Sequence, residues 1–207
     1  MKKIILLLAA IASSILSFAQ IEYTNSPPFD AEMFAERLAG YGVDIFNAEL
    51  TCGDSSSGYF WNGGTTNLGM ESGIVLTTGT TEIAFSPNTV GDAGVDNGED
   101  GSSLLEEFPN CYGITFNACI LEFDFIAYGD EISLNYIFGS EEYPEYVGSA
   151  FNDVFAIVIE GLPEYPPQMS MLERNIALIP GSPGLNVLAN HLNFAHYSHL
   201  YQDNTGD

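Results

Sequence analysis

The side chains best suited to chemistry lie in one acidic loop, residues 139–153, between two apolar segments. Five oxygen-bearing residues are close together in it: Glu141, Glu142, Glu145, Asn152 and Asp153. Neighbouring carboxylates repel each other, and this costs folding free energy unless a cation or hydrogen-bond donors offset it. Because binding residues concentrate on loops held by a rigid scaffold, we expect a site here. The predicted metal ligands are Glu141, Glu142, Asn152 and Asp153.

A second acidic loop covers residues 86–107, where acids alternate with glycines. Calcium takes six to eight oxygen ligands from a loop flexible enough to surround it. The second predicted ligand set is Asp92, Asp96 and Asp100. The spacing differs from that of an EF-hand loop, so a solvated surface loop is the alternative interpretation.

Two further interpretations of the first loop stay open. A pair of carboxylates can cleave sugars by acid–base chemistry, which would make Glu141, Glu142 and Asp153 part of a carbohydrate-active enzyme. The acids can instead cap strand ends by accepting bonds from backbone amides. The sequence contains no Gly-x-Ser-x-Gly nucleophile motif and no phosphate-binding loop, so we expect a protein that is not an enzyme.

Three tyrosines are candidates for stacking on a sugar ring, because aromatic side chains combine an apolar face with a polar tip. They are Tyr59, Tyr143 and Tyr146. Packing inside the fold is the alternative role for each of them.

The first 19 residues are typical of a secretory signal peptide. Lys2 and Lys3 precede an apolar run over residues 4–12, and a small-x-small site ends at Ala19. The run is too short to span a bilayer, and no later segment reads as a transmembrane helix. We therefore expect cleavage after Ala19 and a protein that is secreted or on the cell surface.

The charge balance restricts the partners. The 207-residue chain has 28 acidic and 4 basic residues, a net charge of −24, which becomes −26 once Lys2 and Lys3 are removed. Such a chain repels nucleic acid and anionic lipid. Bound divalent cations would reduce the self-repulsion, and a solvated acidic surface is the alternative.

The chain has three cysteines, Cys52, Cys111 and Cys119, an odd number for an exported protein. One disulfide is expected in an oxidising compartment. We predict Cys111–Cys119, which would close a short loop before a strand. Cys52 would then be free or paired outside this chain.

Residue patterns predict a mainly β fold. After a polar lead-in, 20–29, Asp30 is a predicted N-cap for a helix over 31–39. A strand over 43–46 follows, then a long turn region over 51–69 around Tyr59–Trp61. Later segments read as strands: 73–79, 119–126, 132–138 and 153–159. The second and third of these are predicted to form a hairpin, and the whole to form an antiparallel β-sandwich.

Several segments resemble one known family. Phe138-Gly-Ser-Glu-Glu-Tyr-Pro-Glu-Tyr-Val147, followed by Phe151-Asn-Asp-Val-Phe-Ala156, resembles the signature of the choice-of-anchor L domain. Gly73-Ile-Val-Leu-Thr-Thr-Gly79 and Asn175-Ile-Ala-Leu-Ile-Pro-Gly181 are also similar to it. The resemblance covers roughly 40–207 and implies a bacterial exported protein with a variable C-terminal surface anchor and no established catalytic activity. Because family members continue into further strands, we expect the domain, 30–207, to lack its last strands.

Together these patterns predict a secreted or cell-surface binding or adhesion module, non-enzymatic and stabilised by calcium. Its ligand is unknown and is expected to be a carbohydrate or a protein. The alternative is the carbohydrate-active enzyme described above.

Overall fold

The computed structural model describes residues 20–25, 29–86, 90, 93–107, 113–161 and 175–202. The predicted signal peptide, Asp92 and Cys111 lie outside these residues.

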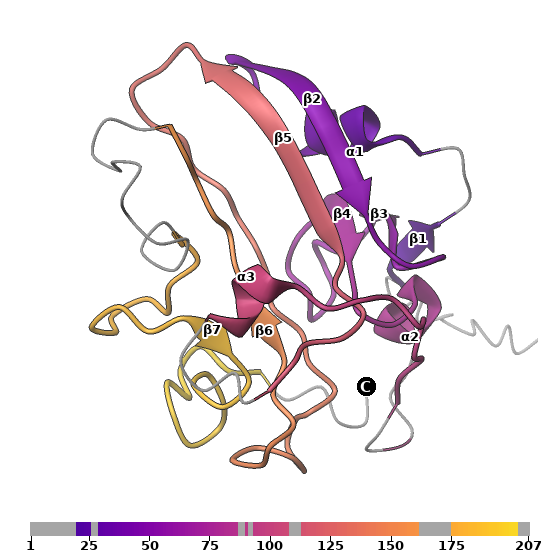
Figure 1. Cartoon of the computed structure of the whole chain (residues 1–207), viewed down its shortest axis with the longest axis vertical. Helices are drawn as coiled ribbons and strands as arrows, with labels where there is room; N and C mark the ends of the chain where they lie inside the picture. The colour runs from indigo at the N-terminus through magenta and orange to yellow at the C-terminus, as the bar shows by residue number, and fades with distance from the viewer. Residues whose placement is uncertain are drawn as a thin grey trace, which may run out of the picture.

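A three-stranded antiparallel sheet has the order β1-β3-β4 (Figure 1). Its strands are β1, Glu22–Thr24; β3, Ser57–Trp61; and β4, Ser72–Leu76. The sequence placed 57–61 in a turn region, and that is wrong. Aromatic residues alternate between a buried and a partly exposed face of β3, with Phe60 only 4% exposed, so the segment meets the requirement of a half-buried strand.

The longest ladder joins β2, Val43–Thr51, to β5, Ile120–Ala127. It runs antiparallel from Val43 opposite Ala127 to Thr51 opposite Ile120, with an irregularity after Phe46. Along β5, Leu121, Phe123 and Phe125 are partly buried and Glu122 and Asp124 are exposed, which confirms the alternation predicted from the sequence.

The predicted hairpin between 119–126 and 132–138 is wrong. β5 pairs with the distant β2, and residues 131–140 form no strand. Alternation along a strand identifies which face is apolar but not which strand is the partner. Ile132 and Leu134, from the predicted apolar face, are 50% and 41% exposed.

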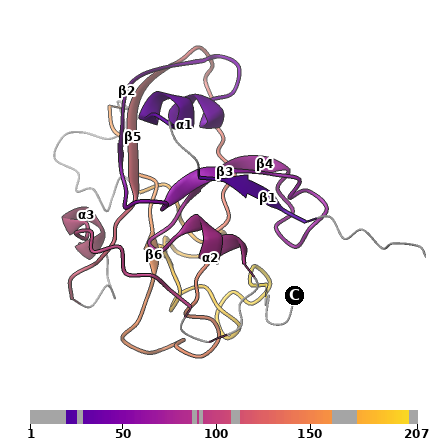
Figure 2. The ribbon, with the colours of Figure 1, turned by 90° about the vertical axis from the view of Figure 1, so that its right-hand side faces the viewer.

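Helix α1, Ala31–Leu38, contacts β2, β5 and β4 and lies between the two sheets (Figure 2). The Met33 N–H donates to Asp30 Oδ1 at 2.8 Å, which confirms the predicted N-cap. Phe34 and Ala35 are completely buried, and the Phe34 ring packs against Tyr59 of β3. Burial of the apolar face that contains Phe34 and Ala35 between two sheets explains why so short a helix is stable in this chain.

Two shorter helices, α2 (Thr81–Phe85) and α3 (Ser103–Glu106), follow β4 in the chain. The rest of the described chain is mostly loop. It contains β6, Val154–Phe155, paired antiparallel with β7, Val187–Leu188. The strand predicted over 153–159 is thus shorter than expected, although Val158 adds an isolated bridge to Asn175.

The described residues therefore form three small antiparallel sheets with three short helices, which confirms a mainly β chain with little helix. Within the same residues, no helix has both the length and the apolar content needed to cross a bilayer.

Candidate functional site

The acidic loop around Asp153 is organised by one serine. Ser140 Oγ donates to Asp153 Oδ2 at 2.7 Å and accepts the backbone N–H of Glu142 at 3.1 Å. Ser140 comes just before the paired glutamates, and Asp153 just before β6, so the hydroxyl ties together the two ends of the loop. The structure thereby brings Glu142 and Asp153 into one environment.

The two carboxyl groups are partly buried and influence each other. Burial raises the pKa of Asp153, while the hydrogen bond from Ser140 acts in the opposite direction. Burial, and then the negative charge of Asp153, raise the pKa of Glu142. The Glu142 Oε2 atom is buried, with no hydrogen-bond partner among the described residues. A buried carboxylate oxygen without a donor favours either a proton or a cation.

The other predicted ligands of this loop differ from that pair. Asn152 Oδ1 accepts the N–H of Asn190 at 2.9 Å, so this amide connects the loop to the segment after β7. Glu141 is half-buried, next to Glu142 in the chain. Across the described ranges, no three Asp, Glu, His or Cys side chains are grouped as a metal site would need.

Asn190, which lies outside the acidic loop and was not identified from the sequence, holds the loop in place through hydrogen bonds. Asn190 Oδ1 accepts the Gly148 N–H at 2.6 Å, and its Nδ2 donates to the Ser149 carbonyl at 3.2 Å. Next to it, the Ala189 N–H donates to the Asp153 carbonyl at 3.1 Å. The repeated asparagines after β7 were the available signal, since asparagine both donates to and accepts from backbone groups.

Two of the three residues in the second predicted ligand set, Asp96 and Asp100, lie within the described residues. Asp96 is exposed, and its pKa is lowered by the backbone hydrogen bond from Gly98 and then by the Asn117 side chain. Asp100 is exposed and takes part in backbone pairing, with a bridge to Phe116. Asp92 lies outside the described residues. Local hydrogen bonds therefore engage the Asp96 carboxylate, and a cation at this loop stays a prediction.

A match to a known protein family includes both acidic loops. A family model described as the Choice-of-anchor L domain matches residues 22–199. This chain belongs to the Choice-of-anchor L domain family. The match starts earlier than the roughly 40–207 expected from the resemblance, and it therefore includes β1 and α1. No curated protein and no solved structure matches the chain significantly.

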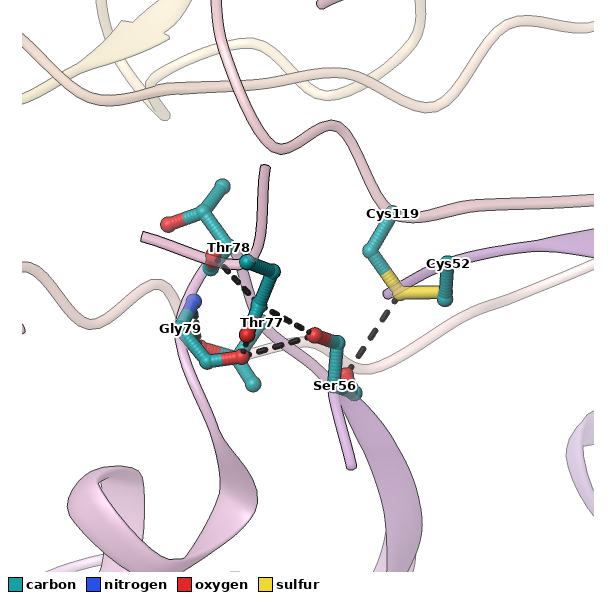
Figure 3. The surroundings of a disulfide bond; sticks show 7 residues. Cys52, Ser56, Thr77, Thr78, Gly79 and Cys119 are labelled. Carbon is teal, nitrogen blue, oxygen red and sulfur yellow. Dashed lines mark hydrogen bonds between the residues drawn. A yellow bond between two sulfur atoms is a disulfide. The ribbon is translucent and has the colours of Figure 1, made fainter. Parts of the chain in front are cut away.

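This Choice-of-anchor L domain has a disulfide between Cys52 and Cys119, at the end of the β2–β5 ladder (Figure 3). The predicted pair Cys111–Cys119 is wrong, because Cys119 is bonded to Cys52. The ladder brings Thr51 opposite Ile120, so the Cα atoms of the next residues are 4.2 Å apart although they are 67 positions apart in sequence. A structural disulfide agrees with the exported location of the family.

The disulfide is next to the hydrogen bonds that attach the second acidic loop to Ser56 and Gly79. Cys119 Sγ lies 3.5 Å from the carbonyl oxygen of Ser56, and Ser56 Oγ donates to the Gly79 carbonyl at 2.7 Å (Figure 3). Asn97 Nδ2 reaches the same place, donating to Ser56 Oγ at 2.7 Å and to the Gly79 carbonyl at 2.8 Å. Asn97 therefore fixes the loop to the cross-linked end of the ladder.

The three tyrosines predicted to stack on sugars are all engaged in packing. The Tyr59 ring contacts Phe29 and Phe34, and Arg37 lies 5.6 Å from its centre. The Tyr143 hydroxyl donates to the Leu192 carbonyl, and its ring meets Tyr201. The Tyr146 ring packs edge-on against Phe151. Packing, the alternative role named for them, therefore describes these three side chains.

Proposed function

We propose that this exported domain is a non-enzymatic binding or adhesion module, secreted or displayed at the cell surface. We further propose that calcium stabilises it at Glu142 and Asp153. The antiparallel β-sandwich predicted from the sequence is part of this proposal, with α1 lying between the layer that contains β2–β5 and the layer that contains β3–β4. Family membership supports export, and the contacts of α1 with both sheets support the layered arrangement.

The observation that carries the calcium proposal is the buried Oε2 atom of Glu142, which lacks a partner beside a second partly buried carboxyl. Two such groups repel when both are ionised, and a divalent cation removes that penalty. Glu142 and Asp153 would supply the charged oxygens and Ser140 a hydroxyl. Water and backbone carbonyls would complete the six to eight ligands that calcium takes.

Thermal unfolding tests this proposal. At a calcium concentration a hundredfold above Kd, a site present only in the folded state adds about 2.7 kcal/mol. The melting temperature should therefore fall by several degrees in chelator and recover in calcium. Magnesium should restore less, because it needs a tighter octahedron and releases water reluctantly.

A matched pair of variants locates the effect. Glu142→Gln should remove most of the calcium response, whereas Glu131→Gln, an exposed acid outside the loop, should keep it. Identical melting curves in chelator and in millimolar calcium would mean that calcium does not bind the folded domain, and the calcium proposal would then be dropped.

The carbohydrate-active enzyme is the second candidate, because a carboxyl with a raised pKa beside another carboxyl is also what a general acid requires. Incubation with a polysaccharide panel separates the two functions. Reducing sugar released by the wild type, but not by Glu141→Gln or Glu142→Gln, would establish the enzyme. We expect no release.

A further inference from the structure

An open groove lies between the end of α1 and the start of β2, away from both acidic loops in the sequence. Its volume is about 480 Å³, and it is lined by Glu36, Ala39, Gly40, Val43, Asp44 and Ile45. Its two charged lining residues are both carboxylates, Glu36 and Asp44. The groove can therefore accept hydrogen bonds and positive charge, and it repels anions.

Two strongly exposed tyrosines are close to residues of this groove, one by a hydrogen bond and one in the chain. The Tyr128 side chain is 71% exposed, and its hydroxyl donates to Asp44 Oδ2 on the groove wall. The Tyr128 N–H donates to the Gly42 carbonyl at 2.9 Å, which fixes the tyrosine at the end of the β2–β5 ladder. Tyr41, between the groove residues Gly40 and Val43, is fully exposed. These two rings, unlike the three named by the sequence, are open to a partner.

None of the residues that line the groove is a cation. Arg37 is the one Lys or Arg within the described ranges, and its guanidinium already lies over the Tyr59 ring. That contact shows the pairing that an arginine makes in this fold, with an aromatic face on one side and acids nearby. Tyr41 and Tyr128, with Glu36 and Asp44, offer the same combination to a cation from outside.

We propose that this groove binds a lysine or arginine side chain from a basic segment of a partner protein. The ammonium or guanidinium group would be held by the Glu36 and Asp44 carboxylates, with the tyrosine faces covering it. The inference rests on the proposed binding function and names its partner class. It does not depend on calcium at Glu142 and Asp153.

The test is titration of the full exported domain with a short tri-arginine peptide, followed by isothermal calorimetry at 0.15 M salt. At that ionic strength, attraction between charges is screened beyond about 8 Å. Carboxylates next to the bound peptide should therefore affect its affinity more than distant ones. A peptide with citrulline in place of arginine has the same shape without the charge. We expect binding of the arginine peptide and none of the citrulline peptide.

Two double variants with equal loss of charge decide where the peptide binds. Glu36→Gln with Asp44→Asn should weaken binding roughly ten-fold, the effect of losing two charge-assisted contacts. Glu82→Gln with Glu131→Gln, outside the groove, should change it less than two-fold. Tyr41→Ala should weaken it about three-fold through loss of the ring face. Melting curves would check that each variant is folded.

Equal weakening by both double variants would overturn the proposal, since binding would then follow net charge alone. So would tighter binding of a neutral oligosaccharide than of the peptide, which would assign the groove to sugars. Failure here with a retained calcium response would reject the groove and leave the calcium proposal standing. The reverse pattern would reject the calcium site alone.

Discussion

The amino-terminal region, β1 to β5, and the carboxyl-terminal region, residues 131–161 and 175–202, are stabilised in different ways. In the first, five strands pair in two antiparallel sheets, and the Cys52–Cys119 disulfide closes one end of the β2–β5 ladder. In the second, one two-residue strand pair is surrounded by loops. There, asparagine side chains hydrogen-bond to backbone groups, as the strands of a ladder do elsewhere.

Each region has a small core of its own. The buried apolar residues of the amino-terminal region are Phe34, Ala35, Phe60 and Ala118, and those of the carboxyl-terminal region are Ala177, Ile179, Val187, Leu188 and Ala189. Among the described residues, none of the fully buried apolar side chains of the second core is aromatic, and buried Asn175, Asn186 and Asn193 accompany them. Because polar networks are strong only when every member is satisfied, the region that holds the acidic pair depends on individual hydrogen bonds.

The largest effect should come from the cross-link of the amino-terminal region. Replacing Cys52 and Cys119 by alanine removes a constraint across 67 residues, which should lower the free energy of unfolding by about 4 kcal/mol. Chemical denaturation measures this value. Cys111→Ser is the matched control and should change it little; an equal loss in that variant would contradict the Cys52–Cys119 assignment.

The next effect should come from the asparagine network of the carboxyl-terminal region. Asn193 is fully buried; its side chain accepts the N–H groups of Ala195 and His196 and donates to the carbonyls of Ala189 and Asn190. Asn193→Ala leaves these groups without their partner and should cost about 3 kcal/mol. Exposed Ser198→Ala is the control. A loss below about 0.5 kcal/mol for Asn193→Ala would mean that water replaces the network.

A smaller, pH-dependent effect should distinguish the acidic pair. Both carboxyls have pKa values raised in the folded state, above the ordinary 3.8 for Asp153 and 4.5 for Glu142. The folded state then holds protons more tightly than the unfolded state. Their stabilising contribution is therefore present below the ordinary values and is lost as pH rises through the raised ones.

Asp153→Asn cannot ionise, so in chelator it should melt above the wild type at pH 7, by roughly 2–4 °C for an effect of about 1 kcal/mol in a chain of this size. The difference should shrink near pH 3, where the wild-type carboxyl is protonated as well. Differential scanning calorimetry at both pH values checks this. A difference that is the same at both would indicate altered packing instead of relieved ionisation.

An effect of similar size should come from the cap of α1. Asp30→Ala removes the acceptor of the Met33 N–H and should cost about 1 kcal/mol in the free energy of unfolding. Asp30→Ser retains a side-chain oxygen and should restore most of this loss. If Asp30→Ala were neutral, packing of Phe34 and Ala35 alone would fix the start of the helix.

Local chemistry explains which parts of this fold could be predicted. The cap at Asp30, the alternation in β5 and the mainly β class follow from neighbouring residues, and the structure has all three. The pairing of β2 with β5, and the Cys52–Cys119 bond that depends on it, join residues far apart in sequence. The alternation of apolar residues along a strand does not identify its partner strand, so neither could be predicted.

The same limit applies to the candidate site. The sequence identified Glu142 and Asp153 as neighbours in one loop, but it could not show that Asn152 is engaged by Asn190, or that Asn97 is tied to Ser56. It also named tyrosines by their loop position. Exposure depends on tertiary packing, so Tyr41 and Tyr128 were found only in three dimensions.

If the domain is displayed at the cell surface, as proposed above, the position of the disulfide has a mechanical consequence. Tension applied between the chain ends would peel the ladder from the Val43–Ala127 pair toward Cys52 and Cys119, and stop there. The segment between the two cysteines, with β3, β4, α2 and α3, is bypassed by the covalent bond. About 220–240 Å of extensible chain thus stays out of the path of the force, and the second acidic loop keeps its attachment to Ser56 under load.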